Sequence, residues 1–243
     1  MNNLSLMNGL EISSKGAVYF KDDSSYLVVG DLHLGLEKYM RQQGVFVSKK
    51  QLKEIKLILN DLINKYGKDI TLILNGDIKH DFGKYTYEDK KEIKNLLTYL
   101  SERIKHLVLI KGNHDNYLIS IAEELGIELK ESFETEKFFV FHGDKDLKFP
   151  ERKHVVMHHL HPSLTLKDEV GAKLKIPCFL VSKRHQYYRI IAPALSHYSP
   201  GMNVLHWTSS KILDIRLEDY EVYAVDGEEI YFFGKLGKLR EKI

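Results

Sequence analysis

The chain has 243 residues, of which 43% are hydrophobic and 29% are charged, and its formal net charge is +2. This composition excludes a disordered or fibrous protein, and the apolar runs are too short to cross a membrane, so we expect no membrane partner. The single cysteine, Cys178, excludes an internal disulfide framework, and the first residues lack a signal-peptide pattern, so we expect a cytoplasmic protein. The mild positive charge neither requires nor excludes a nucleic-acid partner.

The first half of the chain alternates strand-like and helix-like segments. Residues 1–16 are polar and are expected to form a loose lead-in. Ser48 is the expected N-cap of the first long helix, and Gly67 ends that helix. Strands are predicted at 26–30, 70–74 and 107–110, and helices at 48–66, 87–102 and 117–125. Strands that alternate with helices predict a parallel sheet with right-handed crossovers.

The second half consists of short β-type runs, which predict a mixed or antiparallel sheet packed on the first. The runs are residues 138–141, 154–157, 178–181, 188–191, 212–215, 220–225 and 230–233. Asp226-Gly227 predicts a hairpin between the last two runs. We expect a single domain over residues 1–243, with a motif-bearing core at 17–215 and C-terminal strands with a basic tail at 216–243.

Polar side chains with metal-binding chemistry follow five of the predicted strands. In chain order they are Asp31 and His33, then Asp77, then Asn113 and His114, then His142, and finally His158, His159 and His161. Polar groups beyond the carboxyl ends of strands lie where open α/β sheets bind their ligands. Carboxylate, amide and imidazole groups are also suitable donors for transition-metal ions. Five strand ends of this kind predict a metal site at one sheet edge.

The ordered motifs resemble those of the calcineurin-like metallophosphoesterases. They are Asp-x-His, Gly-Asp, Gly-Asn-His-Asp, His-Gly and His-x-His, and they span about residues 26–162. Residues 30–44, 76–83 and 159–162 are most similar to the archaeal and bacterial branch that includes the DNA ligase-associated metallophosphoesterases. The resemblance implies an α/β fold with a two-sheet β-sandwich core flanked by helices, in four αββα layers. It also implies two divalent metal ions, with Mn²⁺ expected first and Fe, Zn, Ni or Co as alternatives.

The resemblance assigns the ligands of the two ions. One ion is expected to be held by Asp31, His33, Asp77 and His161, and the other by Asp77, Asn113, His142 and His159. Asp77 would therefore bridge the two ions. This agrees with elementary chemistry, since a shared carboxylate offsets part of the charge of two adjacent cations.

Three further residues are candidates for work on the substrate. His114 is expected to bind the phosphate and protonate the leaving group. Asp115 is expected to orient His114 and keep it charged, or, as an alternative, to be the N-cap of the helix that follows. His80 is a candidate substrate contact, with an exposed loop position as the alternative.

Two features of the sequence each have two alternative interpretations. His158 stands where the family usually has glycine. If the segment continues the strand, the side chain of His158 points away from those of His159 and His161. His158 then either perturbs the turn or packs at the surface. Several aromatic and imidazole side chains are suited to base stacking or, alternatively, to packing against the sheet. They are Tyr85, Tyr87, His197, Tyr198, His206 and Trp207.

The candidate ligands and the family resemblance together predict an enzyme that hydrolyses phosphodiester bonds through a metal-activated water. The resemblance favours DNA, RNA or nucleotides, cyclic ones included, as substrates, so a nuclease is one form of the prediction. A small-molecule phosphomonoesterase is the alternative, and a non-catalytic metal-binding interaction module is a further one. The presence of every expected ligand together with His114 favours an enzyme.

Overall fold

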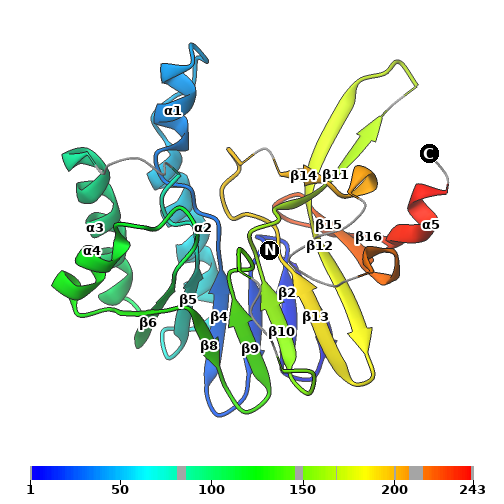
Figure 1. The fold of residues 1–243 in the computed structure, drawn as a ribbon, viewed down its shortest axis with the longest axis horizontal. Coiled ribbons are helices and arrows are strands. Elements are labelled where there is room, and N and C mark those ends of the chain that lie inside the picture. The colour runs from blue at the N-terminus through cyan, green and yellow to red at the C-terminus, as the bar shows by residue number, and fades with distance from the viewer. Residues whose placement is uncertain are drawn as a thin grey trace.

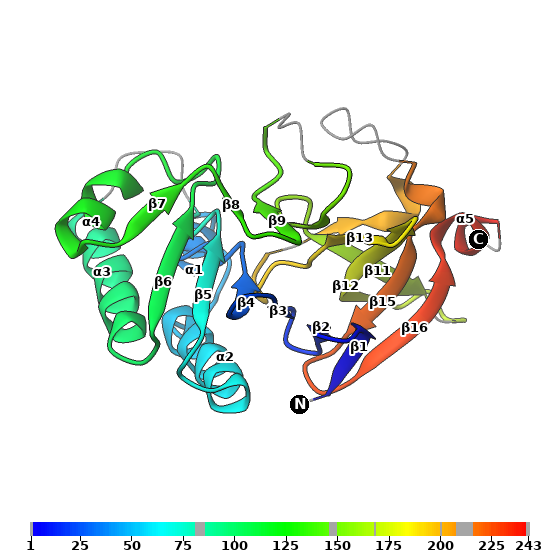
Figure 2. The same ribbon diagram turned by 90° about the horizontal axis from the view of Figure 1, so that it is seen from below.

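The computed structural model of the chain describes residues 2–80, 86–145, 150–167, 169–199, 201–207 and 216–241. Two β-sheets pack face to face, and helices lie on the outer faces (Figure 1, Figure 2). The expected α/β fold, with two sheets flanked by helices, is confirmed. None of the helices in the described part of the chain is long and apolar enough to cross a membrane.

The first sheet combines an antiparallel and a parallel half. Its strands follow the chain in order: β1 (Asn3–Met7), β2 (Leu10–Ser13), β3 (Val18–Lys21), β4 (Ser25–Val29), β5 (Thr71–Asn75), β6 (His106–Ile110) and β7 (Glu128–Lys130). Pairing is antiparallel from β1 to β4 and parallel from β4 to β7. The parallel half therefore has the predicted strand–helix–strand order.

The expected loose lead-in is wrong, because residues 3–13 form the hairpin of β1 and β2. The missed signal is an Asn8-Gly9 pair between two alternating apolar stretches, which is a strong hairpin pattern. Gly9 has φ of 78°, the left-handed conformation that such a turn requires. Leu10 and Ile12 are fully buried between the sheets, which explains why this segment is ordered.

The second sheet is mixed, within the range that the sequence predicted. Its strands are β8 (Ser132–Glu134), β9 (Phe138–Phe141), β10 (His154–Met157), β11 (Pro162–Lys167), β12 (Lys173–Arg184), β13 (Tyr187–Ile191), β14 (Met202–Asn203), β15 (Glu221–Val225) and β16 (Ile230–Lys235). The order is β14-β11-β12-β13-β10-β9-β8, and β15 pairs with both β12 and β16. The predicted hairpin at Asp226-Gly227 joins β15 and β16. The strand expected at 212–215 lies outside the described residues.

Three apolar clusters hold the layers together. The central cluster lies between the two sheets and includes Phe20, Phe138 and Phe179. The outer face of the first sheet is covered by α2 (Gln51–Tyr66), α3 (Tyr87–Ser101) and α4 (Leu118–Leu125). Among the described residues, the elements that cover the outer face of the second sheet are short: the 3₁₀ helices η1 (Val204–His206) and η2 (Leu217–Asp219), and α5 (Leu236–Arg240). The fourth layer is therefore thin, and part of the basic tail is a packed helix.

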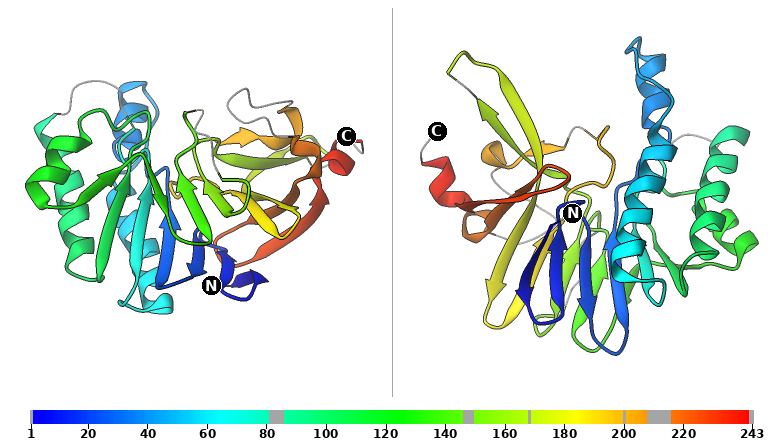
Figure 3. Two further views of the ribbon diagram at one scale, coloured as in Figure 1. Left: turned by 60° about the horizontal axis from the view of Figure 1, so that its bottom comes forward. Right: turned by 180° about the vertical axis from the view of Figure 1, so that it is seen from behind.

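Two elements project from one end of the molecule. They are α1 (Leu36–Gln42) and the hairpin of β11 with β12 (Figure 1, Figure 3). Each projection is connected to the candidate site, because α1 begins three residues after His33 and β11 begins directly after His161. The fold therefore provides a surface on either side of the polar strand ends.

Candidate metal centre

Two groups of candidate ligands meet at the carboxyl ends of β4, β5, β9 and β10. The first ligand group is Asp31, His33, Asp77 and His161, and the second ligand group is Asp77, His142 and His159. Within each group the donor atoms all lie within 4.8 Å of one another. Because Asp77 belongs to both groups, one carboxylate lies between two sets of metal donors.

Asn113 supplies an oxygen beside these groups. It lies between Gly112, which packs against Asp77, and His114, whose backbone N–H donates to Oδ1 of Asp77 at 3.0 Å. The side-chain oxygen of Asn113 is buried and has no hydrogen-bond donor among the described residues. A buried oxygen without a donor costs free energy, and a bound cation would remove that cost. The amide therefore fits a metal site.

Short distances between ring nitrogens and carboxylate oxygens show how tightly the donors converge. Nε2 of His161 lies 3.1 Å from Oδ2 of Asp31 and 3.2 Å from Nε2 of His33. Nε2 of His142 lies 3.4 Å from Oδ2 of Asp77. These nitrogens and oxygens point at shared volumes, which is the arrangement that a divalent ion requires.

The backbone at the candidate ligands is unusual. Among the described residues, six other than glycine have positive φ, and five of them are candidate ligands. The five are Asp31 (55°), His33 (46°), Asp77 (49°), His159 (66°) and His161 (41°). Each such conformation costs roughly 1–2 kcal/mol for a residue with a Cβ atom. The surrounding structure thus stabilises strained turns at these side chains.

Gly112 makes room for the shared carboxylate. A Cβ atom at this position would lie 2.2 Å from Oδ1 of Asp77, far inside contact distance. Only glycine therefore lets the loop after β6 approach the loop after β5. The close approach therefore explains the glycine of the Gly-Asn-His-Asp sequence, separately from any chemistry of its later residues.

The buried charges balance one another before any ion binds. Burial alone would raise the pKa of Asp31, but the charges of His161 and His142 hold it well below its usual range. Burial lowers the pKa of His142, but the hydrogen bond to Asp77 and the charge of Asp31 outweigh this and raise it to about 9. Burial lowers the pKa of His33 to about 3. His33 is therefore already neutral at pH 7, as a metal ligand must be.

His114 faces the shared carboxylate from the side. Its Nδ1–H donates to the backbone carbonyl of His80, which fixes the ring, and its Nε2 lies 3.8 Å from Oδ2 of Asp77. The ring of His80 lies beside that of His114, with centroids 5.8 Å apart, and packs edge-on against His33 at 5.5 Å. His80 thus lies at the border of the site, and it is half-buried where the alternative expectation was an exposed loop position.

Asp115 has different contacts from those expected. Its Oδ1 accepts from the backbone N–H groups of Ile78 and Lys79 at 3.0 and 3.3 Å, and its Oδ2 accepts from Gly112 at 3.0 Å. The helix that follows has Tyr117 as its N-cap, without a side-chain cap, so the N-cap alternative is wrong. The ring of His114 is fixed by a carbonyl instead. Asp115 joins the loop after β5 to the loop after β6.

His158 is fully buried, so a surface position is wrong. Residues 158–161 form a turn and do not continue β10, and the alternation of a strand therefore does not apply. The side-chain amide of Asn75 donates to Nδ1 of His158 at 2.8 Å, and the backbone carbonyl of Asn75 accepts from Nδ1–H of His142 at 3.0 Å. Asn75 therefore links His158 to His142 of the second ligand group.

Sequence reasoning missed two residues that hold the loop of His33. Gln51 donates to the carbonyl oxygen of His33 at 2.7 Å and accepts from the backbone N–H of Gly35 at 3.1 Å. Glu37 accepts from the backbone N–H groups of Lys50 and Gln51 at 2.8 and 3.0 Å. Glu37 therefore caps the start of α2, the role that was expected of Ser48. The helix begins at Gln51. No pattern in the sequence relates residues so far apart.

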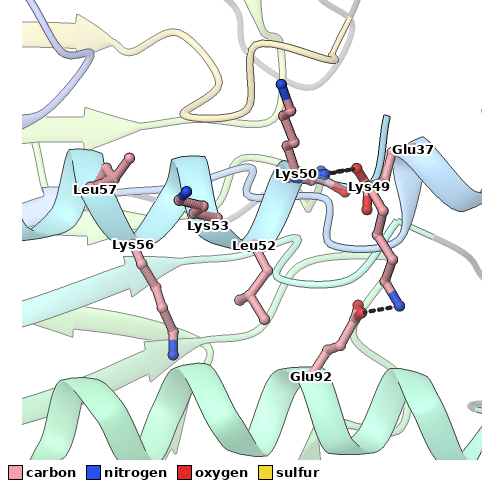
Figure 4. A pocket seen from close by; sticks show the side chains of 9 residues that line it. Glu37, Lys49, Lys50, Leu52, Lys53, Lys56, Leu57 and Glu92 are labelled. Carbon is pink, nitrogen blue, oxygen red and sulfur yellow. Dashed lines mark hydrogen bonds and ion pairs between the residues drawn. The ribbon is translucent and has the colours of Figure 1, made fainter. Parts of the chain in front are cut away.

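Two hollows lie near the candidate centre. The first, the His161 pocket, has a volume of about 310 Å³ and is lined by His161 together with Ser163, Lys175, His197, Tyr198, Ser199 and Gly201. Hydroxyl Oγ of Ser199 lies 2.9 Å from Nδ1 of His161 and so orients that ring. The second hollow, of about 400 Å³, lies between α2 and α3 and is lined by lysines and two glutamates (Figure 4).

The aromatic residues that were candidates for base stacking are separated by the fold. His197 and Tyr198 line the His161 pocket, close to a candidate ligand. Trp207 packs against the outer cluster of the second sheet, which is the packing alternative. Tyr87 is 81% exposed at the start of α3, and His206 is exposed in η1. Tyr85 lies outside the described residues.

The converging donors form two candidate metal sites at one sheet edge, and comparison with known proteins identifies the family. The family model of the calcineurin-like phosphoesterases matches residues 24–225, so the chain belongs to this family. The crystal structure of Pseudomonas putida nuclease MPE is similar, with a TM-score of 0.66 and 19% sequence identity over 96% of this chain and 99% of that chain. At this identity the likeness shows a common fold. Among curated proteins none matches the chain in sequence.

Proposed function

We propose that this protein is a binuclear metal-dependent phosphodiesterase that acts on nucleic acids or nucleotides, cyclic ones included. The observation that carries the proposal is the position of Asp77 in both ligand groups, with the ring of His114 beside it. Membership of the phosphoesterase family supports the reaction class. The nuclease name of the structural neighbour belongs to that protein and supports the choice of a polynucleotide substrate here.

In this proposal the first ligand group holds one divalent ion, and the second ligand group together with Asn113 holds the other. Bound ions of this kind supply charge neutralisation for the phosphate and lower the pKa of water. Mn²⁺ is the proposed ion, since carboxylate, amide and imidazole donors suit it, although the same donors accept other transition metals. The buried carboxylate of Asp77 neutralises part of the charge of both ions.

His114 is the proposed acid and phosphate-binding group. Because Nδ1 donates to the carbonyl of His80, a protonated His114 presents its second proton at Nε2. Nε2 is on the side of Asp77, so this proton points at the site where the phosphate would lie. It can first hydrogen-bond a phosphate oxygen and then pass to the leaving oxygen. A carbonyl acceptor fixes the ring without consuming that proton.

The test of the reaction is hydrolysis of bis-p-nitrophenyl phosphate and p-nitrophenyl phosphate, each with MnCl₂ and with EDTA. We expect hydrolysis that requires metal, with the diester turned over faster than the monoester. Absence of metal-dependent hydrolysis of both compounds, in a protein that binds two ions, would contradict the enzyme proposal. Faster turnover of the monoester would replace it by the phosphomonoesterase alternative.

The test of the acid is His114→Ala, compared with His106→Ala. His106 is an exposed histidine at the start of β6, the strand whose other end leads to His114. We expect His114→Ala to lower the rate by roughly a hundredfold or more while manganese content stays at two ions per chain. His106→Ala should change neither quantity. Loss of manganese in His114→Ala would show that His114 is a ligand and not the acid.

A further inference from the structure

The His161 pocket has a lining suited to an anion. Among the described residues, its lining includes one lysine, histidines and three serines, and no aspartate or glutamate. The pocket shares His161 with the first ligand group, so it opens directly beside the candidate metal centre. The ring of His161 lies between the two, because its Nε2 faces Asp31 of the first ligand group and its Nδ1 faces Ser199 of the pocket.

A buried hydroxyl lines this pocket. Ser163 is only 3% exposed, and its Oγ makes no hydrogen bond to the described residues. A buried hydroxyl without a partner costs about 1–3 kcal/mol, so a ligand oxygen that accepts from it would gain a favourable site. Gly201 packs close to this hydroxyl, because a Cβ atom there would lie 3.1 Å from Oγ of Ser163 and 2.9 Å from the backbone oxygen of His161.

A lysine charge lies near that hydroxyl. Ser163 pairs with Pro177 across β11 and β12, and Lys175 lies two residues before Pro177, on the same face. Nζ of Lys175 donates to the backbone carbonyl of Gly201 at 2.6 Å. No described carboxylate lies within ion-pair distance of this ammonium group. Lys175 therefore keeps two N–H donors and a full charge for an anion.

The lysine-lined hollow between α2 and α3 differs in this respect. There Nζ of Lys49 lies 3.4 Å from a carboxylate oxygen of Glu92 (Figure 4). Lys56 donates to the side chain of Asn95 at 2.5 Å. Glu37 also lines that hollow. Two of its lysines already interact with side chains of this chain. By contrast, the single lysine of the His161 pocket has no acidic partner among the described residues.

We propose that the His161 pocket is a second phosphate subsite, which binds the phosphate next to the scissile one in a polynucleotide strand. Lys175 and Ser163 bind that phosphate, and His161 links the subsite to the metal centre. This inference rests on the proposed function and makes it more specific. The preferred substrate is then a chain with at least two consecutive phosphodiesters, rather than a mononucleotide or a cyclic nucleotide.

The kinetic test compares substrates with one and with two phosphodiesters. We would measure kcat/KM for bis-p-nitrophenyl phosphate and for the thymidine trinucleotide that contains two internucleotide phosphates. For the wild-type protein we expect the trinucleotide to be preferred. In Lys175→Ala the ratio of the two kcat/KM values should fall roughly tenfold, since a hydrogen bond to a charged group is lost. Lys173→Ala is the matched control, because Lys173 lies two residues away on β12 but outside the pocket lining, and it should leave the ratio unchanged.

A second variant separates binding from folding. Ser163→Ala should lower the same ratio by a smaller factor without lowering Tm, since its hydroxyl makes no hydrogen bond to the described residues.

An equal fall of the ratio in Lys173→Ala would overturn the subsite in favour of general surface charge. Proportional loss on both substrates in Lys175→Ala would also overturn it.

A binding test in EDTA separates this inference from the proposed function. Affinity for a fluorescent thymidine oligonucleotide would be measured by anisotropy at several salt concentrations. The slope of log K against log salt should be smaller by about 0.7 in Lys175→Ala than in Lys173→Ala, as expected for one lost phosphate contact to a single strand. Equal slopes would refute the subsite even if bis-p-nitrophenyl phosphate is hydrolysed. A difference in slope without any hydrolysis would retain the subsite and refute the proposed function.

Discussion

The two sheets contribute different chemistry to the candidate centre. The first sheet supplies both carboxylates, Asp31 and Asp77, whereas the second sheet supplies imidazoles only. As a result the first ligand group contains two carboxylates, and the second contains only the shared one. A divalent cation gains more from two anionic donors than from one. The two ligand groups are therefore unequal in charge, and they are coupled because both contain Asp77.

Replacing the shared carboxylate should break both groups at once. Asp77→Asn keeps the shape of the side chain and removes its charge, so we expect loss of both ions and a fall in bis-p-nitrophenyl phosphate hydrolysis of roughly a thousandfold or more. Metal analysis of the purified protein and steady-state kinetics would measure this. A variant that retained two ions per chain would show that Asp77 does not bridge.

Replacing one unshared ligand in each group should show that the groups are unequal. Asp31→Asn should weaken the tighter manganese site by roughly a hundredfold, because it removes one of the two anionic donors. His159→Asn should weaken only the weaker site. Manganese titration by calorimetry would distinguish the two sites. If His159→Asn weakened the tighter site more than Asp31→Asn did, the order of affinities would be reversed.

Metal binding should become tighter as the pH rises. The pKa of His142 is raised from 6.5 to about 9, so below pH 9 its ring must release a proton before it can bind an ion. We expect up to about a tenfold gain in affinity per pH unit between pH 7 and 9, with proton release visible by calorimetry in buffers of different ionisation enthalpy. Without metal the sign is opposite. The protonated ring stabilises the fold fully below pH 6.5, and that stability is lost as the pH rises through 9. A pH-independent affinity would contradict the expected charge balance.

Loosening the loop of His33 should affect the first ligand group alone. Gln51→Leu removes the hydrogen bonds to the carbonyl of His33 and to Gly35. We expect manganese affinity at the tighter site to fall by about tenfold, with the other site unchanged. Gln186→Leu, at an exposed turn, is the control. Equal weakening of both sites would show that the loop does not act on one group selectively.

The smallest effect is expected where one side chain joins loops that serve both groups. Asp115→Asn replaces an acceptor that receives three backbone N–H groups, so one donor loses its partner at a cost of about 1–3 kcal/mol. We expect a fall in Tm of roughly 2–10 °C, measured by differential scanning calorimetry. Asp61→Asn, on the exposed face of α2, should leave Tm unchanged. A normal Tm for Asp115→Asn would show that these hydrogen bonds do not stabilise the fold.

Much of the fold followed from local patterns. The parallel strands β4, β5 and β6 and the helices between them were predicted because buried strands and amphipathic helices have distinct periods. The hairpin of β1 and β2 also had a local signal, in Asn8-Gly9, that the prediction overlooked. By contrast, the roles of Asp115, His158 and Glu37 depend on contacts with residues 13 to 83 positions away, or on a turn where a strand was expected.

By itself the sequence predicted which side chains meet at the candidate centre, because each follows a strand whose apolar residues place its carboxyl end at the edge of a sheet. It also determined the family, since the order of these motifs is specific. Only the tertiary structure decided how the donors divide into two groups around Asp77, because that division depends on how the second sheet packs against the first. It alone brought Ser163 and Lys175 beside His161, since cross-strand pairing and a turn near Gly201 form that pocket.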